Sequence, residues 1–334
     1  MRLVRTLLRL FCLLLLAPVC AGFAVILYYH LPYDRQAREV AFSVQRGEPF
    51  REISRNLAEE ELLRFPDLFT VLARLQGLDQ QVKAGEYLFD SSWNPAGILG
   101  ALSHGRVVLQ KLTVPEGLTV RQISALMGLQ GLAEPGEVLA LSRDPEFLRE
   151  LGLEGASLEG FLFPDTYHFA RGLPAREMLK HMVDRFHEVY DSGMREKQQA
   201  MGHTLLEVVT LASIVEKESG HGEEKPLVAS VLHNRLARGM LLQCDPTVIY
   251  GLEDFGGRLT RSHLRTPHPY NTYVHPGLPP GPIANPGLDS LRAVLEPERT
   301  TYLYFVSKND GTHHFSTNLR DHNRAVDKYQ RGGR

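Results

Sequence analysis

The sequence is poor in cysteine and carries no excess charge of either sign. Its 334 residues include three cysteines, Cys12, Cys20 and Cys244, and its formal net charge is −2. Cys12 and Cys20 lie in an apolar N-terminal run, so the rest of the chain has one thiol. This excludes an intrachain disulfide and a cysteine-rich metal site there. The lack of a basic excess argues against nucleic acid as a partner.

Common catalytic signatures are also absent. The sequence has no H-E-x-x-H zinc motif, no G-x-S-x-G elbow, no phosphate-binding loop and no dinucleotide fingerprint. His313, His314 and His322 lie close in sequence, but strand alternation would place His313 and His314 on opposite faces. We therefore expect neither a metal nor a cofactor. A serine hydrolase would need Ser213 or Ser219, and nothing identifies a base for either.

The N-terminus is apolar, and residues 10–29 carry no charge. This length suffices to span a bilayer as a helix. Three arginines precede it, which predicts a cytoplasmic N-terminus and an exported remainder. A cleaved signal peptide is the alternative, because LLLLAPVCAG ends in small residues. The apolar run continues past that point and favours an uncleaved anchor. A lipoprotein at Cys20 is disfavoured by the bulk of Val19.

Beyond the anchor, the pattern predicts an α+β fold. Strands over Val40–Val44 and Ala84–Phe89 should flank helices over Phe50–Ala58 and Pro66–Leu75. This order is loosely similar to a LysM-type sugar-binding module, and a generic small α+β unit explains it equally well. We expect a cytoplasmic tail at 1–9, a transmembrane helix at 10–29, a LysM-like βααβ subdomain at 38–105 and a larger α+β catalytic domain at 106–331.

The most informative stretch begins at a capping box, in which Thr204 is followed by Glu207. This pattern predicts a helix whose apolar residues recur at helical spacing. Glu216, Glu218 and then Gly220 close it. At ~100° per residue, the two carboxylates point to nearly opposite sides.

Glu218 continues the apolar stripe, whereas Glu216 lies further round, toward Lys217 and solvent. Partial burial and the C-terminal end of the helix dipole would both raise the pKa of Glu218, which suits a general acid. Periodicity alone also allows a frayed last turn with two solvated glutamates.

The following segments bring polar residues toward this helix end. Pro226 can open a second helix that ends at Gly239, and Asp245 can cap a third. A carboxylate, Asn234, Gln243 and Asp245 would then share one neighbourhood, which suits a sugar-binding cleft.

Two further segments are candidates for lining a cleft. Thr266–Gly287 is rich in proline and glycine yet too apolar for a free linker, so we expect an ordered loop over an active site. Its polar contacts would be Asn271, Tyr273 and Asn285. Leu158–Phe169 is dense in aromatic residues and could line a saccharide cleft or be an ordinary packed loop. A hairpin over 302–316 and a helix capped by Asn318 should end the chain.

Several long motifs carry a resemblance. They are IVEKES at 214–219, VASVLHNRL at 228–236, LLQCDPTVIYG at 241–251, YNTY at 270–273, GLPPGPIANPG at 277–287 and YLYFVS at 302–307. In this order they resemble the MltG/YceG-like family of membrane-anchored endolytic peptidoglycan transglycosylases. The chain departs from the family pattern at Phe161 and Phe163, and His233 and Cys244 stand at positions not expected to be fixed.

The resemblance implies a reaction. Such enzymes cut the β-1,4 bond between N-acetylmuramic acid and N-acetylglucosamine inside nascent glycan strands, without water, and leave 1,6-anhydro ends that terminate the strand. Glu218 matches the family's single acid and base. The resemblance also implies work at the inner membrane, with the catalytic domain on the outer side, beside the peptidoglycan synthases (penicillin-binding proteins). Supporting roles in holding the sugar fall to Asn234, Gln243, Asp245, Asn271 and Tyr273.

Two other classes of function stay open. A peptidoglycan hydrolase (muramidase) would use water and a second carboxylate, for which Asp245, Glu223 and Asp165 are candidates. A non-catalytic cell-wall-binding scaffold would use the LysM-like unit instead.

Overall fold

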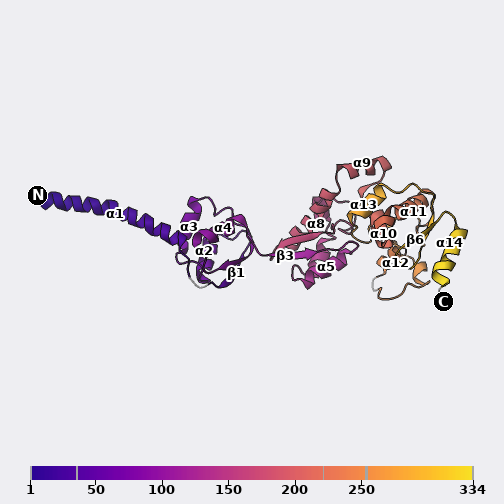
Figure 1. The fold of residues 1–334 in the computed structure, drawn as a ribbon, viewed down its shortest axis with the longest axis horizontal. Helices are drawn as coiled ribbons and strands as arrows, with labels where there is room; N and C mark the ends of the chain where they lie inside the picture. The colour runs from indigo at the N-terminus through magenta and orange to yellow at the C-terminus, as the bar shows by residue number, and fades with distance from the viewer. Residues whose placement is uncertain (1, 35–36, 221, 253–254, 333–334) are drawn as a thin grey trace. The chain divides into compact units, whose positions relative to one another are not determined.

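The chain forms two units in a computed structural model that describes residues 2–34, 37–220, 222–252 and 255–332, with side chains from residue 16 onward. Unit 1 comprises Met1–Gln110 and His168–Leu173, and unit 2 comprises Lys111–Tyr167 and Pro174–Arg334. Figure 1 shows the course of the chain.

The first element is a long helix, α1 (Arg2–His30). Among the residues that the structure describes, no helix has the combination of length and apolar character that a membrane span requires. This finding covers only part of the expected transmembrane helix at 10–29. The side chains of the tail at 1–9, and those at 10–15, lie outside the described part.

Unit 1 contains the predicted strand–helix–helix–strand order. Strands β1 (Glu39–Val44) and β2 (Gly85–Asp90) pair antiparallel, with Val40 opposite Phe89 and Phe42 opposite Tyr87. Burial alternates along β1, because one face packs on helices and the other faces water. The helices are α2 (Phe50–Glu59), α3 (Pro66–Leu75) and α4 (Pro95–His104). Their apolar faces share one core with the sheet.

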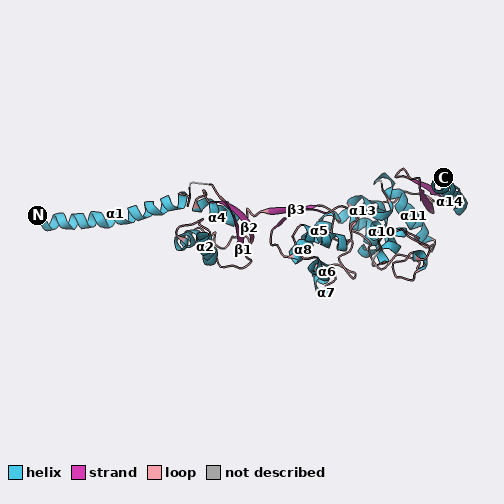
Figure 2. Ribbon diagram, turned by 90° about the horizontal axis from the view of Figure 1, so that it is seen from below, coloured by secondary structure: helices cyan, strands magenta, loops and turns pink. Residues whose placement is uncertain are grey.

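A second small sheet pairs β3 (Leu109–Thr113) with β4 (Thr166–Ala170). The sequence pattern did not predict β4, because TYHFA follows an aromatic run without clear alternation. Figure 2 shows that the strands of the protein are few and short beside the helices.

Unit 2 is mainly helical. Its first helices are α5 (Val120–Leu129), α6 (Pro135–Leu141), α7 (Pro145–Glu150), α8 (Ala175–Val189) and α9 (Ser192–Met201). The next are α10 (Leu205–Glu218), η1 (Gly222–Glu224), α11 (Lys225–Ala237), α12 (Asp245–Gly251), η2 (His263–Arg265) and α13 (Leu288–Leu295). The helix α9 was not predicted, because its sequence SGMREKQQAM has few apolar residues to set a period.

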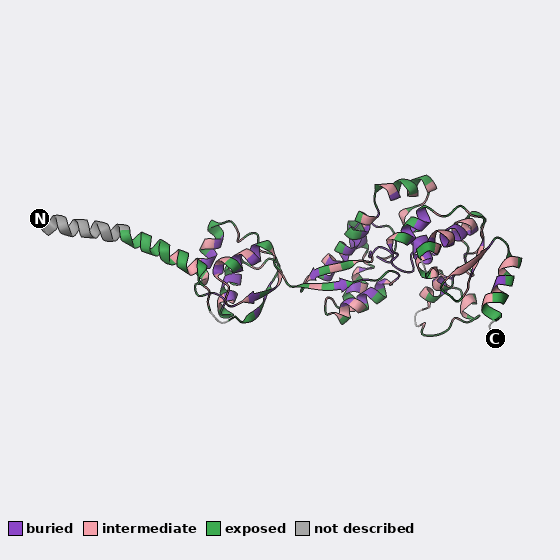
Figure 3. Ribbon diagram, viewed as in Figure 1, coloured by how far each residue is buried: buried purple, intermediate pink, exposed green. Residues whose placement is uncertain are grey.

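Helix α10 lies at the centre of unit 2. All residues from 208 to 215 are buried, and α10 packs against α11, α12 and α13. Figures 1 and 3 show α10 among these helices, with much of its length buried. A helix buried on every side fixes the direction of its last residue.

The chain ends with a hairpin and a helix. Strands β5 (Tyr304–Ser307) and β6 (His313–Ser316) pair antiparallel. Asn318 caps α14 (Leu319–Val326), as predicted, and a single π-turn, η3 (Asp327–Arg331), follows it.

Candidate active site

Helix α10 delivers Glu218 to a cavity. The predicted capping box fixes its start: the Thr204 hydroxyl accepts from the Glu207 N–H at 3.2 Å, and the Glu207 carboxylate accepts from the Thr204 N–H at 2.8 Å. The helix then runs through the core and ends at Glu218, which is half-buried. The carboxyl group lines a cavity of about 520 Å³.

The cavity is built from separate parts of unit 2. The end of α10, the α11–α12 segment and the loop that carries Tyr273 contribute to its lining, together with the β5–β6 hairpin, α14 and η3. Polar and aromatic lining residues are Glu218, Arg235, Gln243, Asp245, Tyr273, Tyr304, Phe305, Ser307, His313, His322, Asn323 and Gln330.

The environment of Glu218 favours its neutral form. Burial raises the pKa of this carboxyl group to about 7, and the nearby negative charge of Asp245 adds to the rise. A hydrogen bond with Cys244 and the positive charge of Arg235 oppose it. A carboxyl group with a pKa near neutrality can donate a proton in one step and accept one in the next.

Asp245 is held in the same cavity by Tyr273. The tyrosine hydroxyl donates a 2.6 Å hydrogen bond to the Asp245 carboxylate, and burial beside this carboxylate raises the pKa of Tyr273. The prediction that Asp245 caps its helix is wrong. Cys244 holds the N-cap position of α12, and the Asp245 side chain is already inside the first turn, where it bonds Tyr273 instead of the helix backbone.

Gln243 adopts an unusual backbone conformation at the cavity wall. Its φ is 53°, in the left-handed region that a residue with a side chain seldom occupies. The Gln243 N–H donates to the Thr272 carbonyl at 3.1 Å, and the Cys244 N–H donates to the Thr272 hydroxyl at 3.0 Å. These bonds hold the strained backbone and direct Gln243 at the cavity.

Glu216 faces away from the cavity, as the helical period predicts, but the expectation that it faces solvent is wrong. Its side chain is 9% exposed and forms a 3.1 Å ion pair with Lys225, which is 7% exposed. The same carboxylate accepts from the Gly287 N–H at 3.0 Å and from the Ser290 hydroxyl at 2.7 Å. Both donors belong to the start of α13, and Lys225 belongs to α11. Glu216 therefore links α10 to both of these helices.

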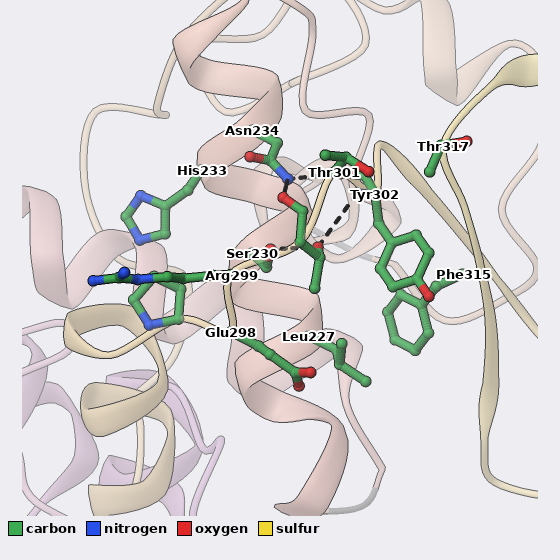
Figure 4. Close-up of a pocket in the computed structure, with 12 residues that line it drawn as sticks. Leu227, Ser230, His233, Asn234, Glu298, Arg299, Thr301, Tyr302, Phe315 and Thr317 are labelled. Carbon is green, nitrogen blue, oxygen red and sulfur yellow. Dashed lines mark hydrogen bonds between the residues drawn. The ribbon is translucent and has the colours of Figure 1, made fainter.

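Two of the predicted site residues lie elsewhere. The Asn234 amide donates to the carbonyls of Thr300 and Tyr302 at 3.0 and 2.9 Å, and its side chain lines a different cavity (Figure 4). Asn271 is 1% exposed, and its amide donates to carbonyls of its own loop, at 2.8 Å to Thr266. Glu218, Gln243, Asp245 and Tyr273 therefore share the cavity, whereas Asn234 and Asn271 hold the backbone around it.

Sequence reasoning did not assign a site role to Arg235, Tyr304 or His313. Arg235 lies over the Tyr304 ring at 5.1 Å and donates to the Leu303 carbonyl at 2.6 Å. His313 Nδ1 lies 2.7 Å from a carboxylate oxygen of Glu224, and both side chains are nearly buried. No spacing rule connects a helix of unit 2 with a hairpin about 70 residues later, so only the folded chain brings these groups together.

The aromatic segment 158–169 is a packed loop around a buried acid. Glu159 is 4% exposed and accepts from the Val120 N–H, the Tyr250 hydroxyl and the Asn285 amide at 3.0, 3.1 and 3.2 Å. Burial raises the pKa of Glu159 to about 7. These contacts favour the packed-loop alternative, and they bind α5 and α12 together.

Among the residues with described side chains, no three His, Cys, Asp or Glu groups are placed to hold a metal ion.

Comparison with known proteins assigns the family. Residues 42–328 match the model of the YceG-like family, and the chain belongs to this family. It is 31% identical, over 89% of its length and 87% of the relative's, to the endolytic murein transglycosylase of Bacillus subtilis. A Streptococcus pneumoniae protein of the same name is 29% identical, over 91% of this chain and 61% of that protein. The fold is also similar to the crystal structure of a YceG-like protein from Listeria monocytogenes. The TM-score is 0.60 at 31% identity, over 86% of this chain and 99% of that one.

Proposed function

We propose that this chain is an endolytic murein transglycosylase, a lytic enzyme of peptidoglycan. The names of its relatives support the reaction class. The observation that carries the proposal for the site is Glu218, a half-buried acid at the end of a buried helix, with a pKa of about 7 and a cavity in front of it. We assign the activity to unit 2.

The proposed reaction uses Glu218 twice. The neutral acid gives its proton to the oxygen of the β-1,4 bond as the bond from that oxygen to C1 of N-acetylmuramic acid breaks. The resulting carboxylate then takes the proton from the 6-hydroxyl of the same sugar, whose oxygen attacks C1. The products are a new 4-hydroxyl end and a 1,6-anhydro end. Glu218 recovers its proton, and no water is consumed.

The neighbours of Glu218 serve this cycle. The Asp245 carboxylate keeps the Glu218 proton in place at neutral pH, and it also favours the positive charge that develops on the sugar ring. Tyr273 fixes the direction of Asp245. Gln243 and Arg235 offer hydrogen-bond donors to sugar hydroxyl and acetamido groups.

A hydrolase is the second candidate, because Asp245 shares the cavity with Glu218. A muramidase that uses water needs two carboxyl groups beside the glycosidic bond. The two reactions differ in the product: one leaves an anhydro end and the other a reducing end.

We further propose where the reaction takes place. The uncharged run at 10–29 after three arginines supports a single-pass anchor in the cytoplasmic membrane with an extracytoplasmic catalytic unit. There the enzyme would act on nascent glycan beside the penicillin-binding proteins. The βααβ order of unit 1 supports a LysM-like sugar-binding role for residues 38–105.

Matched glutamine variants test the assignment of the acid. Glu218→Gln should abolish release of glycan fragments from purified strands and keep strand binding, because an amide cannot donate the acid proton. Glu216→Gln is the control, two residues away on the other side of α10, and its folded fraction should still cleave. Loss of cleavage in Glu216→Gln with activity kept in Glu218→Gln would refute the assignment.

A further inference from the structure

The β5–β6 hairpin has one covered face and one open face. The pairs Phe305 with Phe315 and Ser307 with His313 place these side chains on one face. The alternate residues lie on the other face, which the C-terminal segment covers. There the His322 ring stacks on Tyr304 at 5.2 Å, and the Tyr329 ring lies 6.0 Å from His314.

The open face carries a continuous row of rings. Tyr302 lies 5.7 Å from Phe315, Phe315 lies 6.2 Å from Phe305, and Phe305 lies 5.5 Å from His313. We call these four residues the ring row. Tyr302, Phe305 and Phe315 are half-buried, and the His313 side chain is 13% exposed. A row of partly exposed aromatic side chains beside a cavity is typical of a binding surface.

The ring row connects two cavities of unit 2. Phe305 and His313 line the cavity of Glu218. Tyr302 and Phe315 line the second cavity, of about 1030 Å³, which extends to α11. Figure 4 shows the Tyr302 and Phe315 rings together on one side of this second cavity, with Asn234 on the helix opposite.

The chemistry of the second cavity suits a sugar. The apolar C–H face of a pyranose packs on an aromatic ring, and its hydroxyl groups need donors and acceptors at the rim. Exposed Glu298, Arg299, Thr301 and Thr317 supply these at the rim.

The end of the ring row nearest Glu218 is rigid. Glu224 accepts from the His313 N–H at 3.0 Å and holds its ring at 2.7 Å, so the ring cannot turn freely. A surface whose rings are fixed before binding loses little conformational entropy when a ligand arrives.

We propose that the second cavity is a distal glycan-binding subsite, joined to the catalytic cavity by the ring row. It holds sugars of the same strand beyond the bond that is cut. The subsite rests on the proposed function for its ligand, and it gives the enzyme a preference for the interior of a long strand over a short end.

Binding to strands of different length tests this proposal. The full-length Glu218→Gln chain, which does not consume its ligand, is titrated with peptide-free glycan oligomers, one just long enough to fill the catalytic cavity and one several times longer. The Kd for the short oligomer divided by the Kd for the long one measures the contribution of the distal subsite, and this quotient is the Kd ratio. Phe315→Ala and Tyr302→Ala in this background should each lower that ratio about fivefold to tenfold, as expected for loss of one stacked ring.

Two further variants make the result decisive. Phe315→Leu keeps an apolar side chain at the paired strand position without a ring, so it should fold and still lose most of the ratio. Tyr329→Ala removes a ring that contacts the covered face, and the ratio should persist. A ratio that survives in Phe315→Leu, or a parent chain that binds both lengths equally, overturns the subsite.

The subsite and the reaction can fail separately. If the unsubstituted chain cleaves strands to anhydro ends but the Kd ratio does not depend on the ring row, the proposed function stands and the subsite is wrong. If no cleavage occurs while the ratio falls in Phe315→Leu, the subsite stands as a glycan-binding surface and the proposed reaction is wrong.

Discussion

Replacing Glu218 with glutamine should stabilise the fold in alkaline solution and leave its stability unchanged in acid. Burial raises the pKa of this carboxyl group from 4.5 to about 7. The stability that the neutral acid provides is therefore complete below pH 4.5 and is lost as the pH rises through about 7. At about 1.4 kcal/mol per pKa unit, the ionised carboxylate costs at most about 3 kcal/mol at higher pH. Glutamine keeps the shape and never ionises, so it avoids this cost.

The assay must report on unit 2. The single tryptophan, Trp93, lies in unit 1, so its fluorescence would report the unfolding of unit 1 instead of unit 2. Urea unfolding of the full-length chain is therefore followed by hydrogen exchange and mass spectrometry of the peptide that covers α10. The difference between Glu218→Gln and the unsubstituted chain should be near zero at about pH 4 and should approach about 3 kcal/mol above about pH 8.

Glu216→Gln is the matched control, and its effect should have the opposite sign. Glu216 neutralises Lys225 in a nearly buried ion pair. Without its charge, the remaining carboxylate near Lys225 among the described residues is the more distant Glu116, at 3.5 Å. We expect a loss of about 3 kcal/mol at neutral pH. A Glu218→Gln chain that is less stable than the parent at alkaline pH, or a gain that does not vary with pH, would refute the reasoning.

Two other perturbations have defined outcomes. Asp245→Asn removes the negative charge that helps to raise the pKa of Glu218. The alkaline limb of the pH–rate profile should therefore shift to lower pH, by about half a pH unit to one pH unit. If initial-rate measurements show no shift of this limb, Asp245 does not act on the acid. Glu159→Ala leaves the Val120 N–H, the Tyr250 hydroxyl and one Asn285 donor without their acceptor. It should cost about 3 kcal/mol in urea unfolding, whereas Glu159→Gln should cost less; equal losses would mean that these hydrogen bonds are not the cause.

Local signals in the sequence predicted local structure well. The Thr204 and Glu207 capping box set the start of α10, and the helical period separated Glu216 from Glu218. Each of these features depends on residues within a few positions of one another, where helix geometry alone determines the arrangement.

Long-range contacts could not be predicted in this way. Glu216 was expected in solvent because its partners include Lys225, nine residues away, and Ser290, 74 residues away. Asn234 was expected near Glu218, but its amide donates to carbonyls 66 and 68 residues away and its side chain lines the second cavity. Asn271 was also expected at the active site, but it donates to carbonyls of its own loop. A polar side chain in a motif can serve catalysis or can satisfy the backbone of a buried loop, and the sequence does not distinguish these two roles.

The family resemblance contributed what periodicity could not. It placed Glu218 in a catalytic role and named the reaction, and the match over residues 42–328 confirms the family. It gave no indication of the ring row, because Tyr302, Phe305 and Phe315 become neighbours only when the two strands pair.

One measurement tests the central claim most directly. Purified glycan strands are digested by the full-length chain in water enriched in heavy oxygen, and the new ends are analysed by mass spectrometry, with Glu218→Gln in parallel. The account predicts internal fragments with anhydro ends that are lighter by one water and carry no heavy oxygen, and no new fragments with Glu218→Gln. Reducing ends that carry the heavy oxygen would show that water attacks C1, and this would contradict the account.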